Sequence, residues 1–332
     1  NAKFLAEHRE LLGRIRSNDI KEAGFASPPR GAGQRQQDQG GAGDVKEAHD
    51  GGHGPLSPDE SLRDAGCLLL AHSLKRNYTL TALDIRGNYV TAAGAIAIAD
   101  ALKQSSTLAT LDMSRNYISD KGATAIFTAL EQNQSLTWLN ISDNSFSDES
   151  AKALAKSLYH NQSLRWLSVS DNRIRAEGAT AIAQALKRNK ALRELDLQCN
   201  NIFGEGATAI AGALKQNSSL TSLDLQSNSI AAEGAAAIAE ALKRNRALTR
   251  LDVSNNKIAA EGAKALAAAL KQNSVLAVLR LFSNNIDGQG AEAVAEALMH
   301  NSSLTWLDLR ENRIYDEGAS AVAESLRHNR AL

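Results

Sequence analysis

The chain has 332 residues, with 37 Lys and Arg against 37 Asp and Glu, so its formal net charge is zero. The charges also balance on either side of Pro58, which argues against binding of nucleic acid or an anionic membrane by a large basic surface. No stretch approaches the ~18 apolar residues of a membrane-spanning helix, and only two cysteines occur, which favours a reducing, cytoplasmic setting.

Residues 1–23 are predicted to form an amphipathic helix. Its apolar positions share one face of a helix, and they are Phe4, Leu5, His8, Leu11, Leu12 and Ile15. The segment lacks the apolar core of a secretory signal. We expect this helix to dock on the end of the domain that follows, and the alternative is that it binds a partner.

Residues 24–58 are predicted to be a flexible linker. All four prolines of the chain lie there, together with many glycines and a Gln-rich run, a composition that cannot bury a core. His49 and His53 are four residues apart but have no Cys nearby, so they are interpreted as solvated histidines rather than metal ligands.

Residues 59–79 are predicted to be a capping half-repeat. The segment 61–77 has apolar and small residues at the helical positions of the units that follow. Cys67 takes the place of a core alanine there, so we expect it to be buried.

Residues 80–332 contain an internal repeat of 28 residues. Ten leucines mark its period without a slip: Leu80, Leu108, Leu136, Leu164, Leu192, Leu220, Leu248, Leu276, Leu304 and Leu332. These residues make nine units plus the first residue of a tenth. Because no polar capping unit follows Leu332, we expect the natural protein to continue beyond it.

Each unit follows the pattern L-x-x-L-x-L-x-x-N-x-I and then a helix, which is the signature of a leucine-rich repeat. In the sixth unit, Leu223 and Leu225 face one side of a short strand, and Asn228 follows where its amide can satisfy backbone groups. The helix places Ala235, Ile238, Ala239 and Leu242 on one inward stripe.

The predicted fold is an α/β solenoid in the form of a horseshoe. Parallel strands stack about 4.8 Å apart and helices roughly 8–10 Å apart, so the stack must bend. The strands therefore line the concave face and the helices the convex face.

The sequence contains no convincing catalytic constellation. The phosphate-binding, serine-hydrolase and zinc-protease motifs are all absent, so we predict a non-enzymatic chain without cofactors or a metal.

The informative positions are those that interrupt the repeat on the exposed side of the strands. The third residue of each unit points outward, and all three tryptophans of the chain lie in that column. Together with departures in the neighbouring columns they form the candidate site, which comprises Trp138, Trp166, Glu194, Arg250, Arg280, Phe282, Trp306 and Arg310. The last five are predicted to form a cationic and aromatic patch. Trp and Arg dominate binding hot spots, which favours a protein-binding surface. The alternative is that the tryptophan rings lie flat on neighbouring side chains and only shield the sheet.

The units resemble the ribonuclease-inhibitor-like class of leucine-rich repeats over residues 80–332, most clearly in 174–189 and 230–245. The resemblance implies a horseshoe fold and protein binding without naming a partner. The single repeat length and the scarcity of Cys argue against ribonuclease inhibition. The near-identity of the units and their Ala, Arg and Gly bias favour a bacterial effector, delivered into a host cell without a Sec signal.

Three hypotheses about function follow. The first is a recognition module, within a type III-type effector, that binds a protein partner and neither nucleic acid nor the membrane interior. In the second, the repeats select substrates for an enzyme such as a ubiquitin ligase encoded beyond Leu332. In the third, the chain is a GTPase-activating protein that uses an edge arginine such as Arg86 or Arg115.

Overall fold

A computed structural model describes residues 9–17, 20–24 and 62–332, in which helices and short strands alternate. The helices are α2 (Arg9–Arg16), α3 (Arg63–Leu74), α4 (Ala92–Leu102), α5 (Ser119–Leu130), α6 (Asp148–His160), α7 (Ala176–Leu186), α8 (Phe203–Leu214), α9 (Ala231–Leu242), α10 (Ala259–Leu270), α11 (Gly288–Leu298) and α12 (Tyr315–His328). The strands are β1 (Glu22–Gly24), β2 (Ala82–Asp84), β3 (Thr110–Asp112), β4 (Trp138–Asn140), β5 (Trp166–Ser168), β6 (Glu194–Asp196), β7 (Ser222–Asp224), β8 (Arg250–Asp252), β9 (Val278–Arg280) and β10 (Trp306–Asp308).

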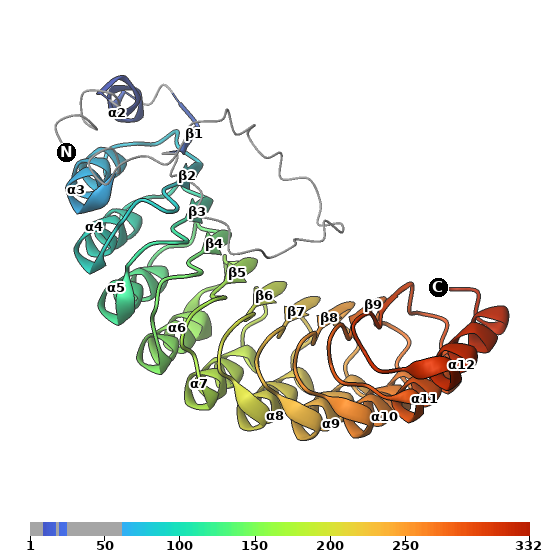
Figure 1. Cartoon of the computed structure of the whole chain (residues 1–332). Helices are drawn as coiled ribbons and strands as arrows, with labels where there is room; N and C mark the ends of the chain where they lie inside the picture. Colours follow the sequence, from blue (N-terminus) through green and yellow to red (C-terminus); the bar gives the residue numbers. More distant parts are fainter. Residues whose placement is uncertain (1–8, 18–19, 25–61) are drawn as a thin grey trace.

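The described strands form one parallel sheet in chain order, from β1 to β10. From β2 onward each strand pairs with the next at the repeat period, so that Trp138 stands opposite Trp166. Figure 1 shows the strands along the inside of a curved solenoid and the helices along the outside. The predicted horseshoe is confirmed, and the wider spacing of helices than of strands explains its curvature.

The core lies between the two layers and is continuous from one unit to the next. In the sixth unit Leu220, Leu223, Leu225 and Ile230 are all buried, as is the predicted helical stripe that ends at Leu242. Each buried leucine contributes roughly 1.5–3 kcal/mol. Because no unit encloses its apolar side chains alone, neighbouring units stabilise one another.

Buried asparagines form a ladder where the chain leaves each strand. The Asn228 amide donates hydrogen bonds at 2.9–3.1 Å to three backbone carbonyls, those of Leu197, Leu225 and Gln226. The Asn228 N–H in turn donates to Oδ1 of Asn256 in the next unit at 2.9 Å. The amides therefore satisfy buried backbone groups and link consecutive units, as the sequence predicts.

The N-terminal segment differs from its prediction. The described helix α2 ends at Arg16, and Glu22–Gly24 form strand β1, so the prediction of one helix over residues 1–23 is wrong in its C-terminal part. β1 pairs with β2, and the Thr81 N–H donates to the Lys21 carbonyl at 2.6 Å. An isolated short strand has no distinctive pattern, and a neighbouring sheet edge decides its conformation.

The predicted capping half-repeat is more complete than its sequence indicates. β1 supplies the strand that lies beside α3, so these two elements have the same relation as β2 and α4. α2 lies outside α3, and its Ile15 is fully buried in the core. Cys67 is also fully buried, as expected for a residue that replaces a core alanine, and burial raises the pKa of its thiol. Apart from Gly24, the predicted linker 24–58 lies outside the described residues, as do Phe4, Leu5, His8, His49 and His53.

Candidate protein-binding face

The strand backbone positions the candidate residues on the concave face. The middle residue of each strand from β1 to β9, such as Leu139 or Leu167, is buried toward the helices, and Leu307 of β10 is partly buried. Because side chains alternate along a strand, the residues on either side of it point away from the core. Parallel pairing in register then turns every such position into a row that crosses the sheet.

Trp138 and Trp166 occupy one of these rows on β4 and β5. Their rings are stacked, with centroids 4.3 Å apart and planes inclined by 6°. Both residues are partly exposed. Glu194 follows on β6, opposite Trp166, and is exposed. The structure therefore brings these three predicted residues together as one aromatic and acidic surface. We call the two stacked rings, Trp138 and Trp166, the tryptophan stack.

The other predicted residues gather at the C-terminal end of the sheet. Trp306 on β10 is 53% exposed. The Arg310 guanidinium lies over the Phe282 ring, 5.6 Å from its centroid. Arg250 lies on β8, opposite Val278 of the next strand. We call this group the C-terminal patch: Arg250, Arg280, Phe282, Trp306 and Arg310. β7 separates it from the surface around the tryptophan stack, so the structure does not join the two groups.

Ion pairs change the electrostatic character predicted for this patch. Arg310 forms a bidentate ion pair with Asp308, at 3.0 and 2.8 Å, and this contact lowers the pKa of that carboxyl. Arg280 Nη1 lies 3.4 Å from Oδ2 of Asp252. The interpretation of the patch as cationic is therefore wrong for these two arginines, because aspartates of the repeat neutralise them.

Three carboxylates lie in register between the two groups, on β6, β7 and β8. We call this row the acidic ladder: Asp196, Asp224 and Asp252. Burial raises the pKa of Asp224 well above its usual range, and the carboxylates of Asp252 and Asp196 raise it further. At one end of the ladder the Ser168 hydroxyl donates a hydrogen bond to Asp196 at 2.7 Å. At the other end Arg280 forms the ion pair with Asp252. The recurrence of these aspartates in the sequence indicates a consensus position and predicts a mild negative potential on the concave face.

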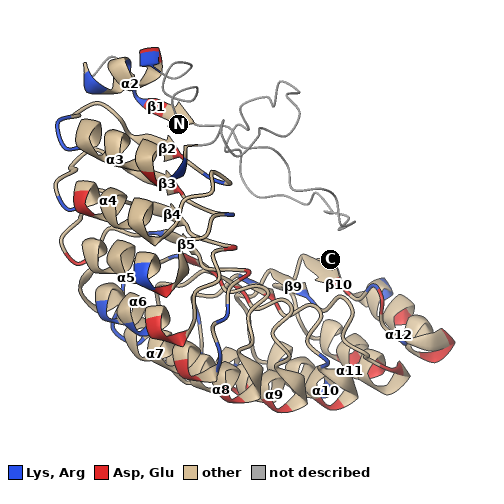
Figure 2. Cartoon of the chain, turned by 60° about the vertical axis from the view of Figure 1, so that its left-hand side comes forward, with Lys and Arg blue, Asp and Glu red and all other residues tan. Residues whose placement is uncertain are grey.

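Other candidate chemistry finds little support in the described part of the chain. It contains no group of three His, Cys, Asp or Glu residues arranged to hold a metal ion. None of its helices combines the length and apolarity needed to cross a membrane. Arg86, considered above for GTPase activation, is ion-paired with Asp84 at 2.9 Å. Figure 2 shows both charge signs distributed along the whole solenoid.

The residues that the sequence analysis missed lie on the opposite, convex face. Tyr159 and Arg188 meet at the C-terminal ends of α6 and α7, where Tyr159 interrupts a column that is Lys in five other units. The run Lys-Arg-Asn-Lys-Ala-Leu-Arg at 187–193 also stands out, because it has four cations and no carboxylate. A search of the helical columns for departures from the repeat would have found both signals.

A model of the leucine-rich repeat matches the chain in nine segments: 76–99, 104–127, 132–155, 160–183, 188–211, 216–239, 244–267, 272–295 and 300–323. The chain belongs to the leucine-rich repeat family. This result confirms the family identified from the sequence, and the matched segments cover most of the chain. Among curated proteins, no sequence matches this leucine-rich repeat protein.

One of two similar solved structures shows the same fold at low sequence identity. A chain of the crystal structure of the Rad7 and Elc1 complex in yeast is 16% identical, with a TM-score of 0.55. The match covers 82% of this leucine-rich repeat chain and 65% of that chain, so this chain spans about two thirds of its length. The actin-binding site 2 of leiomodin-1 matches with 21% identity and a TM-score of 0.33, over 55% of this chain and 88% of that one.

Proposed function

We propose that this chain is a non-enzymatic recognition module that binds a protein partner on its concave face. Leucine-rich repeats and other solenoids present extended concave surfaces of this kind for binding. The observation that carries the proposal is the tryptophan stack, two partly exposed rings 4.3 Å apart on adjacent strands. Broad aromatic surfaces are enriched among residues that dominate binding energies.

The repeat itself does not require aromatic side chains at these positions. The same row holds Ala82, Thr110 and Ser222 in other units, and their strands pair in the same register. The tryptophans are therefore an addition to a sheet that forms without them. Trp306 and the Phe282–Arg310 contact provide a second aromatic anchor farther along the concave face.

The setting of this function is a further part of the proposal. A cytoplasmic location, inside a host cell to which the chain is delivered as an effector, is supported by the composition and by the resemblance described above. Absence of the protein from the host cytosol during infection, measured by fractionation, would contradict it.

The proposal is tested by capturing partners from a eukaryotic cell lysate with the intact chain and with a Trp138→Ala, Trp166→Ala variant. We expect the variant to retain at least about tenfold less of the partner, because removing an aromatic hot spot costs about 2 kcal/mol or more. Circular dichroism must show that the variant is folded.

A matched control removes two exposed apolar side chains from the helical side, as Phe203→Ala, Met299→Ala. It should capture the partner as well as the intact chain does. If the tryptophan variant loses stability but captures the same proteins, the rings only shield the sheet and the proposal is wrong.

A further inference from the structure

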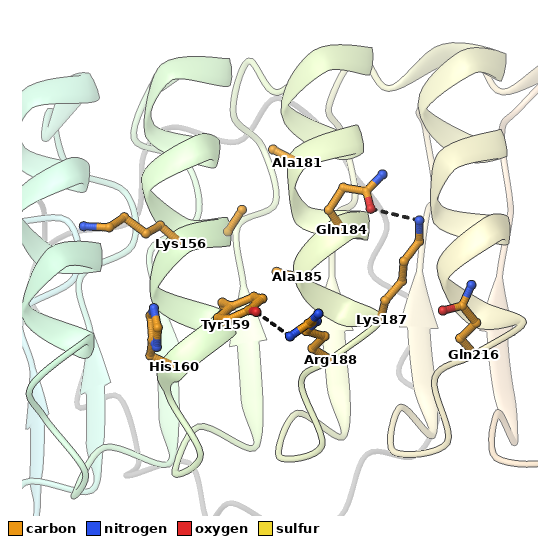
Figure 3. Close-up of a pocket in the computed structure, with 10 residues that line it drawn as sticks. Lys156, Tyr159, His160, Ala181, Gln184, Ala185, Lys187, Arg188 and Gln216 are labelled. Carbon is orange, nitrogen blue, oxygen red and sulfur yellow. Dashed lines mark hydrogen bonds between the residues drawn. The ribbon is translucent and has the colours of Figure 1, made fainter.

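A pocket of about 500 Å³ lies on the convex face, at the C-terminal ends of α6 and α7 and beside α8. Figure 3 shows its polar lining, which includes Lys156, Tyr159, His160, Gln184, Lys187 and Arg188. Lys156 points toward the preceding unit, where it forms an ion pair with Glu131 at 3.1 Å. Arg188 lies beside Tyr159 of the preceding helix, and Lys187 lies between α7 and α8 (Figure 3).

The Tyr159 side chain holds Arg188 in place. Arg188 Nη1 donates a hydrogen bond to the Tyr159 hydroxyl at 2.5 Å, and its guanidinium lies 5.1 Å from the centre of the ring. This contact uses one N–H of a group that has five. The guanidinium is thus oriented before any ligand arrives, which reduces the entropy lost on binding.

The pocket differs from the same place in other units because, among the described residues, neither Lys187 nor Arg188 forms an ion pair with a carboxylate. The lysine at the end of α4, Lys103, pairs with Asp100 three residues earlier at 2.8 Å, and Lys243 pairs with Glu240 in the same way. Lys187 instead donates to the neutral amide of Gln184 at 2.8 Å. Lys215, one unit further, has Gly212 at the equivalent position.

Further cations extend the pocket along the adjacent edge of the solenoid. Arg165 and Arg193 each donate through Nη1 to the backbone carbonyl of the last residue of their own unit, Ala191 and Ser219, at 2.9 Å. Lys190 is exposed between them in the sequence. We call this surface the basic edge patch: Arg165, Lys187, Arg188, Lys190, Arg193 and Lys215. Within the described residues, none of the six forms an ion pair.

The patch exceeds what the helix ends require. Cations at helix C-termini interact favourably with the partial negative charge of the last carbonyls. Here the amides of Asn189 and Asn217 already donate to the carbonyls of Leu158 and Leu186, both at 2.7 Å. Six cations that form no ion pair among the described residues therefore lie in two adjacent units and create a local positive potential in a chain whose net charge is zero.

We propose that the basic edge patch binds an acidic segment of a protein partner, with carboxylates over Lys187 and Arg188. Charge complementarity identifies the class of ligand, since the three planar Arg groups and three Lys groups of the patch suit carboxylates. This interaction surface is separate from the tryptophan stack, and its failure would leave the concave-face proposal intact.

The structure favours a polypeptide over a nucleic acid. Single-stranded nucleic acids use aromatic platforms on which successive bases stack. Two rings line this pocket: Tyr159 already has Arg188 over its face, and the His160 ring packs edge-on against Tyr159 with centroids 5.0 Å apart. The basic edge patch is also interrupted along the solenoid, because Gln216 and Ser218 follow in the columns of Arg188 and Lys190. Farther along, Lys243 and Lys271 are neutralised by Glu240 and Glu296.

The test measures fluorescence anisotropy of a dye-labelled Glu–Ser repeat peptide titrated with the full chain in low-salt buffer. We expect the charge-reversal variant Lys187→Glu, Arg188→Glu to bind the peptide at least about tenfold more weakly. Binding should also disappear at about 1 M NaCl, where the screening length falls to about 3 Å. The Trp138→Ala, Trp166→Ala variant should bind the peptide like the intact chain.

The matched control is Lys243→Glu, Arg244→Glu, which makes the same charge change in the same two columns, two units away. We expect less than about a twofold effect from it, and circular dichroism checks the fold of both variants. No binding at low salt, or equal weakening by both variants, would overturn the proposal. Tighter binding of a single-stranded oligonucleotide of the same charge through Lys187 and Arg188 would overturn it in favour of nucleic acid.

Discussion

At the scale of single residues, the concave face concentrates negative charge that the fold does not fully neutralise. Asp224 lies between Asp196 and Asp252 in register, and its one hydrogen bond from the described residues comes from the Gln226 N–H at 2.8 Å. Like charges on neighbouring strands disfavour each other's ionised form. The acidic ladder therefore makes the stability of the middle units depend on pH.

The variant Asp224→Asn should be more stable than the intact chain at pH 7. In the intact chain the pKa of Asp224 is raised in the folded state, so its ionised form destabilises the fold above that pKa. This loss of stability disappears as pH falls through the raised pKa. We expect a gain of roughly 1–3 kcal/mol, the scale of a like-charge contact near a protein surface. Urea unfolding between pH 4 and 8 measures it, and the gap between the two proteins should close at the acidic end.

Asp308 provides the control of opposite sign. The Arg310 contact lowers its pKa, so its ionised form stabilises the fold above the usual Asp range, and this contribution is lost as pH falls through the lowered pKa. Asp308→Asn should therefore be less stable than the intact chain at pH 7. Equal responses of the two variants to pH would contradict this account of the row.

At the scale of elements, close approach between helices explains the glycine that recurs near the start of each helix. A Cβ atom on Gly206 in α8 would lie 2.6 Å from Ile202 Cγ2 and 3.0 Å from the Ala179 Cβ atom. The requirement is space rather than a left-handed backbone, since Gly87 alone among the described glycines has a positive φ. Ser150 in α6 is the exception, and Asp120 accepts a hydrogen bond from its hydroxyl at 2.7 Å.

Two glycines in α8 make this argument testable within one helix. Gly206→Ala should destabilise the chain by about 1–3 kcal/mol through overpacking. Gly212 has no atom within 4 Å of an added Cβ, so Gly212→Ala should stabilise the helix by about 0.5–1 kcal/mol. Thermal unfolding of both variants gives the comparison. A gain from both would mean that neighbouring helices tolerate a wider spacing.

At the scale of the whole molecule, stability is shared between neighbouring units, so a local change should have a local effect. The N-terminal end shows how the stack begins: β1 covers the edge of β2, and Ala23 and Ile15 extend the core beyond α3. A sheet edge left uncovered would expose the backbone groups and apolar side chains of the unit around α3.

The variant Ala23→Lys places a charge at a position that is 6% exposed. We expect β1 to detach and hydrogen exchange to accelerate in α3 and β2, because an unpaired buried charge costs several kcal/mol. Protection in α9 to α11 should not change. Glu22→Lys, at the exposed neighbouring residue, serves as the control and should leave exchange in α3 unaltered. Acceleration along the whole chain would instead show global cooperativity.

The repeat pattern of the sequence is sufficient to predict the length of the repeat, the core positions and the rows of residues that face outward. These features depend on contacts between a residue and its equivalents 28 positions away, such as Trp138 with Trp166, and a repeated contact leaves a repeated pattern. The leucine columns and the asparagine ladder were therefore predictable residue by residue. The family match confirms this part of the prediction.

The contacts of each outward-facing side chain follow from the tertiary structure and could not be predicted from the repeat pattern. β1 pairs with β2, which is distant in the sequence, and this pairing has no periodic signal. Arg280 and Arg310 form ion pairs with aspartates of the repeat, which neutralise their charges. The basic edge patch also arises from stacking, which brings Arg165 and Arg188 of one unit and Lys215 of the next to one edge of a chain with balanced charge. Periodicity specifies the row in which a side chain lies, whereas its partners depend on side-chain reach and on the departures in adjacent units.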